Sequence, residues 1–344
     1  MLFTTTNHYT ETTATFNLNL LNYYAKKYNF IVVSFYSSLP YTANYYENLS
    51  NVILINANNY FEEILDNIVR KYKPKKITNN IDFFYYFQIF KYDVYKQVFI
   101  RQCYQKILKV LENIKEESIE LTRAIDREKV RATNEQNYIT SPNKIFTCSE
   151  TSKNAIKEYY GKDAVVIQQF TNIKKFLDVP FPNYNLKKTY NVGRTDYIKN
   201  VFSINPNNYH FTQIGSSLLT DKESKKTLNN TNHYDGFFDF NFYINIIQSI
   251  PICLTPCLFE TNGFTVQEAL CMGKITLVNE NSGGNLQFIK NNENGFVIDF
   301  KNNYEDFLDN LDIDTLKKVS KNAKETFKPE LFYNALEDYF LQVC

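Results

Sequence analysis

The chain has 344 residues, of which 44% are hydrophobic and 22% charged, and its formal net charge is +1. This length allows two domains of ordinary size, and the composition is that of a globular protein. The small net charge argues against nucleic-acid binding driven by bulk positive charge. No segment of the sequence approaches the roughly 20 apolar residues of a membrane span. Because the amino terminus lacks a basic stretch followed by an apolar run, we expect no secretory signal and a cytoplasmic location.

The first half of the sequence alternates strand-like and helix-like segments, which indicates an α/β fold with parallel sheets. Hydrophobic patterning predicts strands at residues 2–6, 30–36, 51–55, 76–78, 118–125, 144–148 and 165–168. It predicts helices at residues 11–28, 60–73, 82–115, 126–138 and 151–160. We interpret Ser149 as the N-cap of the last of these helices, rather than as a nucleophile, and Gly161 as its end.

Pro180, Pro182 and Asn183 interrupt this pattern and indicate a linker. The sequence therefore predicts an amino-terminal domain of residues 1–182 and a carboxy-terminal domain of residues 183–329. In the second domain, strands are predicted at residues 189–192, 211–214, 251–254, 275–278 and 296–298, with helices between them and a terminal helix at 332–343.

The six cysteines are scattered, and Cys253 and Cys257 form the only close pair along the sequence. Neither a second pair nor a nearby histidine completes a zinc-binding set. We therefore expect buried, reduced thiols and no metal site.

Residues 254–288 carry the most informative pattern, LTPCLFETNGFTVQEALCMGKITLVNENSGGNLQF. Seven residues separate Glu260 from Glu268, and Asn262-Gly263-Phe264 lies between them. An apolar run predicts a strand before this interval, and residues 266–272 predict a helix. A strand that turns into a helix presents backbone N–H groups at the helix start, which favours anion binding. Two carboxylates beside that helix start can accept hydrogen bonds from hydroxyls, so the pattern suits a nucleotide-sugar.

A second pattern follows the linker, where Lys199 comes soon after Tyr190-Asn191-Val192-Gly193-Arg194. A small residue at a strand end lets a phosphate approach the backbone. The two cations supply positive charge for a diphosphate leaving group.

These patterns resemble the retaining GT-B glycosyltransferases of family 4. The stretch from Glu260 to Glu268 resembles their Glu-x7-Glu donor-binding motif. Three further family patterns follow in order: residues 269–274 resemble "EAMACGxP", residues 281–285 resemble "xxGG", and residues 294–297 resemble "NGxLV". Earlier in the chain, residues 190–200 resemble the family's "xVGRxxxxKG", and residues 145–176 resemble the passage that ends its first domain. Two residues depart from the family pattern, because Asn200 and Thr171 stand where glycine is common.

The resemblance implies a GT-B fold, in which two Rossmann-like α/β domains face a central cleft and a terminal helix, residues 330–344, packs back on the first domain. It implies a hexosyltransferase that retains the anomeric configuration and needs no metal. UDP-sugar is the expected donor, and GDP-sugar is the alternative.

The resemblance also implies residue roles. Arg194 and Lys199 are expected to bind the diphosphate, and Glu260 to support the transferred sugar; these three form the expected catalytic set. Glu268 is expected to hold the ribose hydroxyls. The remaining donor-binding candidates are Gly193, Asn262, Gly263, Phe264 and Thr265.

The first domain resembles the family less closely. Residues 4–10 contain no glycine where the family often has a Gly-Gly loop, and the family's mid-domain histidine is missing, with Asp126 at roughly that place. His8 and Asp126 are candidates for acceptor contacts. The alternatives are an incidental role for His8 and a helix N-cap for Asp126.

The acceptor stays open between a glycan, a lipid-linked sugar, a protein and modified DNA. The DNA alternative has a faint basis, because residues 193–195 and 282–288 resemble phage DNA α-glucosyltransferases. The basic cluster at residues 70–76 suits either a solvated helix end or contact with an anionic surface. The missing glycine loop and histidine suit a further alternative, a glycosyltransferase-like binding subunit without turnover.

Overall fold

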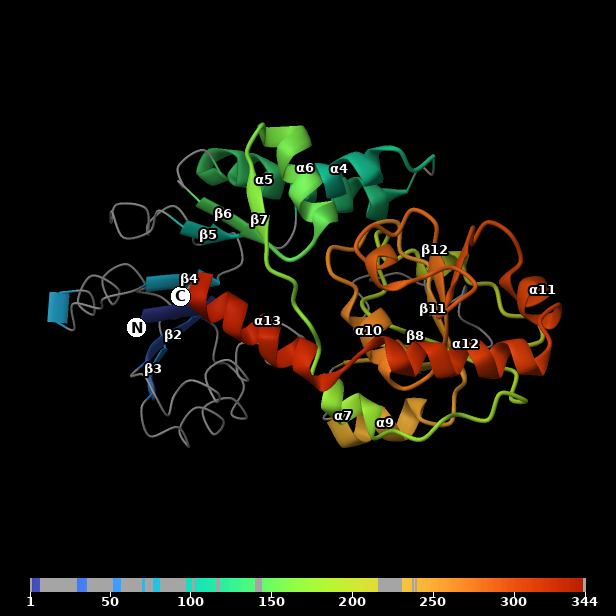
Figure 1. The fold of residues 1–344 in the computed structure, drawn as a ribbon. Coiled ribbons are helices and arrows are strands. Elements are labelled where there is room, and N and C mark those ends of the chain that lie inside the picture. The colour runs from blue at the N-terminus through green and yellow to red at the C-terminus, as the bar shows by residue number, and fades with distance from the viewer. Residues whose placement is uncertain are drawn as a thin grey trace. The chain divides into compact units, whose positions relative to one another are not determined.

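A computed structural model of the chain (Figure 1) describes residues 2–6, 30–35, 52–56, 70–71, 77–80, 97–100, 103–115, 118–139, 144–215, 231–236, 238 and 240–342. The chain divides into two compact units. Unit 1 comprises Met1–Lys106, Arg127–Gln169 and Tyr333–Cys344. Unit 2 comprises Ile107–Asp126 and Phe170–Phe332.

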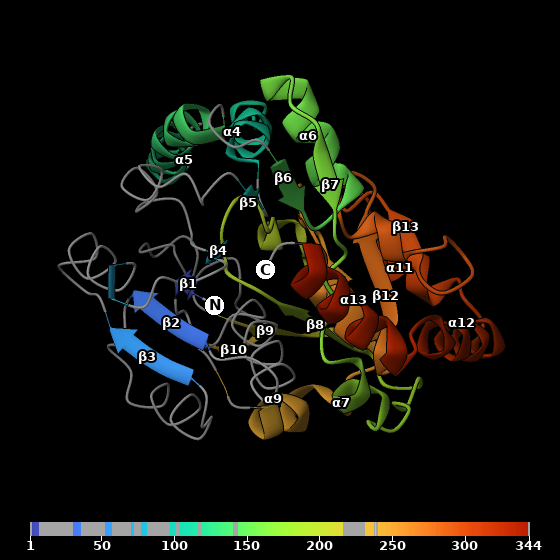
Figure 2. The same ribbon diagram turned by 60° about the vertical axis from the view of Figure 1, so that its left-hand side comes forward.

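The described strands of unit 1 form parallel sheets. The strand order in its four-stranded sheet is β3 (Val52–Asn56), β2 (Phe30–Phe35), β1 (Leu2–Thr6) and β4 (Ile77–Asn80) (Figure 2). A three-stranded sheet has the order β5 (Gln97–Phe99), β6 (Lys144–Thr147) and β7 (Ala164–Val166). Parallel neighbours require crossover connections, so this arrangement confirms the α/β class predicted from the alternating pattern.

Three helices follow β5 in the chain: α4 (Tyr104–Glu112), α5 (Ile119–Ile139) and, after β6, α6 (Glu150–Tyr160). The ends of α6 confirm the prediction. The Ser149 hydroxyl accepts a hydrogen bond from the Ser152 amide at 3.1 Å, and Gly161 ends the helix in the left-handed conformation.

Two predicted elements in this region are wrong. Residues 118–125 were expected to form a strand, but α5 begins at Ile119. The Ser118 hydroxyl accepts a hydrogen bond from the Leu121 amide at 3.1 Å, and the Glu120 carboxylate pairs with Arg123 at 3.0 Å. These contacts within the helix outweigh the partial alternation of polar and apolar residues that predicted a strand. The predicted helix over 82–115 is also wrong in part, because residues 97–99 form β5. The predicted helix at 11–28, and that at 60–73 except residues 70–71, lie outside the described residues.

Unit 2 contains a parallel sheet of six strands. Their order is β10 (Thr231–Tyr234), β9 (His210–Ile214), β8 (Lys188–Val192), β11 (Ile252–Thr255), β12 (Ile275–Asn279) and β13 (Phe296–Ile298). The first strand, β8, is central, and later strands are added first on one side and then on the other. The connections therefore reverse between β8 and β11. In open α/β sheets, ligands bind beyond the carboxyl ends of the strands at such a reversal.

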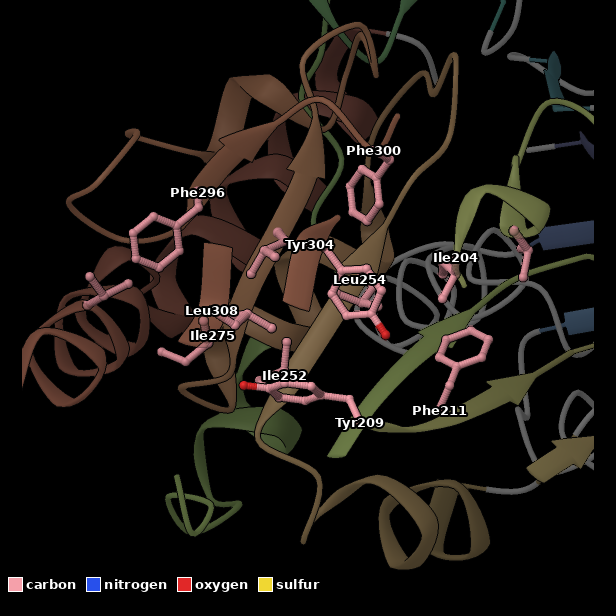
Figure 3. Packing of buried hydrophobic residues seen from close by; sticks show 13 residues of the cluster. Ile204, Tyr209, Phe211, Ile252, Leu254, Ile275, Phe296, Phe300, Tyr304 and Leu308 are labelled. Carbon is pink, nitrogen blue, oxygen red and sulfur yellow. The ribbon is translucent and has the colours of Figure 1, made fainter. Parts of the chain in front are cut away.

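A cluster of buried apolar side chains covers one face of this sheet (Figure 3). Residues of β11 and β12 pack there against α11 (Tyr304–Asp309) and α12 (Ile313–Thr326). Members from these elements are Ile252, Leu254, Ile275, Leu277, Tyr304, Leu308 and Val319. Each such side chain contributes about 1.5–3 kcal/mol when it leaves water, so the cluster stabilises the packing of α11 and α12 on this sheet.

The remaining helices of the described chain are α7 (Ile173–Leu177), α9 (Phe240–Ile247), α10 (Phe264–Cys271) and α13 (Pro329–Gln342), with short 3-10 turns η3 (Val201–Ser203) and η4 (Leu286–Phe288). The terminal helix was predicted at 332–343 and is confirmed, although it starts earlier, at Pro329, where proline suits a first helical position. None of the helices that the structure describes has the length and apolar character needed to cross a membrane.

Candidate functional site

The loop after β8 begins at Gly193 and is held by β9. The Gly193 amide donates to the Ile214 carbonyl at 2.9 Å, and the Gln213 side-chain amide donates to the Gly193 carbonyl at 2.7 Å. Arg194 follows with an exposed side chain, and its Nε lies 3.5 Å from a carboxylate oxygen of Asp196. The first predicted cation therefore stands at the carboxyl end of the central strand.

A tight turn next brings Lys199 toward β11. The Asp196 carboxylate accepts from the Lys199 amide at 2.8 Å. Asn200 adopts the left-handed conformation with φ 51°, which asparagine tolerates better than other residues with a side chain. Its side-chain amide donates to the Pro256 carbonyl at 3.1 Å. Asn200 thus supports a left-handed turn and also ties the β8 loop to the β11 loop.

Lys199 and Glu260 form an ion pair between these two loops, with Nζ against Oε2. Both side chains are largely buried, at 25% and 21% exposure. Burial alone would raise the pKa of Glu260, but the Lys199 charge and the Thr261 and Asn262 amides outweigh burial and hold that pKa below its usual value. Burial would lower the pKa of Lys199, and Glu260 outweighs it in the same way. Both groups are therefore charged at neutral pH.

The Glu260 turn lies directly against the loop that follows β12. The Glu260 amide donates to the Ser282 carbonyl at 3.1 Å, and the Gly284 amide donates to the Glu260 carbonyl at 2.6 Å. A Cβ on Gly263 would stand 3.0 Å from the Asn285 Cα, and a Cβ on Gly284 would overlap the Thr261 carbonyl. The close approach of two backbones explains why both positions are glycine.

Replacing Gly284 by alanine is expected to lower the free energy of unfolding by about 2–3 kcal/mol, because the added methyl meets backbone. Gly161→Ala is the control, since nothing lies within 4 Å of the added Cβ and the cost is mainly the left-handed backbone, about 1 kcal/mol. Urea unfolding followed by circular dichroism compares the two variants. Equal losses, or a smaller loss for Gly284→Ala, contradict the packing described above.

The start of α10 reaches the end of β8. Gly263 precedes the helix in the left-handed conformation, and the Thr265 hydroxyl donates to the Val192 carbonyl at 3.4 Å. The first N–H groups of a helix have no partner within the helix and lie at the positive end of its dipole. The start of α10, at Phe264 and Thr265, thus lies beside the end of β8. Asn262, just before the turn, is buried and accepts at its carbonyl from Gln267 and Gln287 side chains, each at 3.3 Å.

Glu268 lies farther along α10 and is half-buried. It accepts from the Tyr243 hydroxyl at 3.0 Å and from the Thr171 hydroxyl at 3.4 Å. Burial raises the pKa of Glu268 to about 7, although these two hydrogen bonds act in the opposite direction. Thr171 also donates its amide to the Gln267 side chain at 2.8 Å. The threonine that replaces a common glycine is thus part of the surroundings of Glu268.

The two candidates for acceptor contacts, His8 and Asp126, are not among the residues that form the contacts described above. His8 lies outside the described residues. Asp126 lies within α5 and is exposed, so its interpretation as a helix N-cap is wrong. Its predicted acceptor contact stays a prediction.

The cysteines that the structure describes are buried and free: Cys103, Cys148, Cys253, Cys257 and Cys271. Among the described side chains, no three His, Cys, Asp or Glu residues are grouped so as to hold a metal.

Residues 197–325 match the family model described as Glycosyl transferases group 1. No curated protein matches the chain. Sucrose-phosphate synthase from Thermosynechococcus elongatus superposes with a TM-score of 0.74 and 12% identity, over 99% of this chain and 98% of that chain. HepE from Anabaena, in complex with UDP and glucose, superposes with a TM-score of 0.69 and 10% identity, over 99% of each chain. The chain has the GT-B fold. WaaG, a glycosyltransferase involved in lipopolysaccharide biosynthesis, is a further similar structure, with a TM-score of 0.65, 13% identity and 99% coverage of each chain.

The GT-B fold confirms the fold class predicted from the motifs. The matched segment contains Lys199, Glu260 and Glu268, whereas Gly193 and Arg194 precede it.

Three residues of the candidate site were not predicted from the sequence. Gln213 orients the Gly193 carbonyl, and Tyr243 bonds to Glu268. Gln213 is 20 residues from Gly193, and Tyr243 is 25 residues from Glu268, so no local pattern links them. Tyr243 also lies in an aromatic run, which is typical of core packing. Asp196 was within reach of local reasoning, because aspartate often accepts hydrogen bonds from amides a few residues later.

Proposed function

We propose that this chain is a glycosyltransferase that takes a hexosyl group from a nucleotide-sugar and transfers it with retention of configuration. The observation that carries this proposal is the Lys199–Glu260 ion pair at the reversal of the unit 2 sheet. It joins a cation from the β8 loop to a carboxylate from the β11 loop, beside the start of α10. The cation suits the diphosphate of a nucleotide-sugar, and the neighbouring carboxylate suits the sugar attached to that diphosphate.

The donor is proposed to bind to the carboxy-terminal domain, residues 183–329. Lys199 and Arg194 would bind the diphosphate, with Gly193 and the amides of Gly263, Phe264 and Thr265 beside it. Glu268 would accept from the ribose hydroxyls. We propose UDP as the nucleotide, because similar structures were solved in complex with UDP and with UDP-glucose.

In the proposed reaction, the bond from the sugar C1 to the diphosphate oxygen breaks, and its electron pair stays on the diphosphate. The acceptor hydroxyl oxygen bonds to C1 on the same face, and its proton passes to the departing diphosphate oxygen. Negative charge grows on the leaving group as the bond breaks, so Lys199 and Arg194 stabilise the transition state more than the bound donor. Glu260 faces Lys199 and would stabilise positive charge that develops at C1.

The test is a thermal-shift panel of UDP-, GDP-, ADP- and CMP-sugars. A donor at about 100 times its dissociation constant is expected to stabilise the protein by about 2.7 kcal/mol, because it binds the folded state alone. We expect UDP-glucose to raise the melting temperature and to be hydrolysed slowly to UDP. If none of the four raises it, the proposed function is wrong. Binding without release of UDP would instead support a subunit without turnover.

The same hydrolysis assay separates the acceptor classes. Glycans, lipid-linked sugars, proteins and modified DNA are added in turn, and the accepted class is expected to accelerate release of UDP. The identified product then reports the anomeric configuration, and inversion would contradict the proposed stereochemistry.

A further inference from the structure

Glu268 is bracketed by hydroxyl groups from other parts of unit 2. The Tyr243 hydroxyl donates to Oε2 at 3.0 Å, and the Thr171 hydroxyl donates to Oε1 at 3.4 Å. An ionised carboxylate has about four acceptor positions. One position on each oxygen is therefore taken by the protein, and acceptor capacity is left for two hydroxyls of a ligand.

The tyrosine is held in place independently of Glu268. It lies on α9, whose carboxyl end receives the fully buried Lys274: Nζ donates to the carbonyls of Ile247 and Gln248, each at 2.8 Å. Lys274 follows α10 closely in the sequence, so α9 and α10 are joined at this end as well as through Tyr243 and Glu268. Phe240, at the start of α9, packs edge-on against Phe176 with ring centroids 5.3 Å apart.

We propose that Tyr243 is a positioning residue that holds the Glu268 carboxylate in the orientation needed by the ribose hydroxyls of the nucleotide. This inference rests on the proposed function. A half-buried carboxylate has several rotamers, and a single donor on a fixed helix selects one of them. Tyr243 thus acts on the ligand through Glu268 and contributes specificity for a ribose with both hydroxyls.

The groups that face Glu268 are consistent with this role. Among the described residues, the titratable groups around it are Tyr243 on α9, Tyr190 on β8, Cys253 on β11 and Cys271 on its own helix. Burial raises the pKa of each of these four above its usual value, so they stay neutral at physiological pH. Glu268, with a pKa of about 7, is the member of the group that titrates there.

The experiment measures binding of UDP and of 2′,3′-dideoxy-UDP by isothermal titration. Tyr243→Phe removes the donor and keeps the ring. We expect this variant to bind UDP about threefold to tenfold more weakly than the wild type, the usual effect of one lost hydrogen bond. Its affinity for the dideoxy nucleotide should be unchanged, because that ligand has no hydroxyls for Glu268. In the Glu268→Gln background, Tyr243→Phe should have no further effect on UDP.

Tyr209→Phe is the matched control. The Tyr209 hydroxyl donates to the Asp309 carboxylate at 2.8 Å, and Tyr209 lies at the amino end of β9, away from the strand ends that carry the site. This variant should bind both nucleotides as the wild type does. Equal weakening of UDP and dideoxy-UDP by Tyr243→Phe would indicate a structural role and overturn the proposal, and so would no weakening of either. Failure of the wild type to bind any nucleotide would instead contradict the proposed function and the inference with it.

The pH profile of UDP binding gives a second readout. The ionised Glu268 accepts from hydroxyls on all sides, so UDP affinity should rise as the pH increases through about 7. The Tyr243 hydrogen bond favours the ionised form, and its loss raises the pKa of Glu268 further. The midpoint of this rise should therefore move to higher pH in Tyr243→Phe and stay in place in Tyr209→Phe. An unchanged or lower midpoint in Tyr243→Phe contradicts the proposal.

Discussion

Replacing Lys199 by methionine is expected to reduce hydrolysis of UDP-glucose by about 10²–10³-fold, the usual cost of losing a charge-stabilising donor. Lys199 is the cation that the structure places against Glu260, and it would face the diphosphate as the leaving group gains charge. Methionine keeps much of the apolar stem and removes the ammonium group. UDP should also bind about tenfold more weakly, since one charge-assisted contact is lost in the ground state. Initial rates of UDP release and titration with UDP measure the two effects.

Lys187→Met is the control for this variant. Lys187 Nζ lies 2.8 Å from the Asp309 carboxylate in an ion pair that is about half exposed, with side-chain exposures of 52% and 41%. Exposed pairs of this kind contribute about 0–1 kcal/mol, so the control should keep both UDP binding and hydrolysis. If Lys199→Met hydrolyses UDP-glucose at the rate of the control, the leaving-group role of Lys199 is wrong.

Replacing Glu260 by glutamine is expected to separate binding from turnover. Hydrolysis should fall by about 10²-fold or more, because the variant lacks the negative charge that supports C1 in the transition state. The variant should bind UDP as tightly as the wild type or more tightly. Without the Glu260 charge, the Lys199 ammonium is no longer neutralised by a carboxylate and attracts the diphosphate more strongly. A fall in the turnover rate without loss of UDP affinity is therefore the expected signature.

Glu280→Gln is the matched control, because Glu280 is an exposed carboxylate at the end of β12, the strand beside β11. It should leave hydrolysis and UDP binding unchanged. If Glu260→Gln weakens UDP binding and leaves the rate at saturating donor unchanged, Glu260 is a donor-binding residue without a role in the chemical step.

Much of the fold was predictable because its strands are apolar runs. FIVVSF at β2 and ITLVN at β12 are rich in β-branched residues between turns, which favours buried parallel strands. The strand β10 had no such signal. Its residues, TNHY, are mostly polar. Among the described strands it is an edge strand that pairs with β9, and such a strand need not be apolar on both faces.

The candidate site was predictable where its parts are close in sequence. The Glu260-to-Glu268 spacing and the Gly193-to-Lys199 loop are local patterns that the sequence shows directly. Their convergence was expected only from the family resemblance, and the structure brings Lys199 against Glu260. Contacts between distant segments were not predictable in this way. The bond from Tyr243 to Glu268 joins two helices, and it depends on how α9 packs against α10 rather than on any spacing. The left-handed Asn200 shows a further limit, because the sequence did not reveal the backbone conformation at this position.

A crystal structure of the complex with UDP-glucose tests the central claim most directly. The account predicts that the diphosphate lies within hydrogen-bonding distance of Lys199 and Arg194, the ribose against Glu268, and the glucose against Glu260. A nucleotide bound elsewhere on the chain, with Lys199 and Glu260 untouched by the ligand, would contradict it.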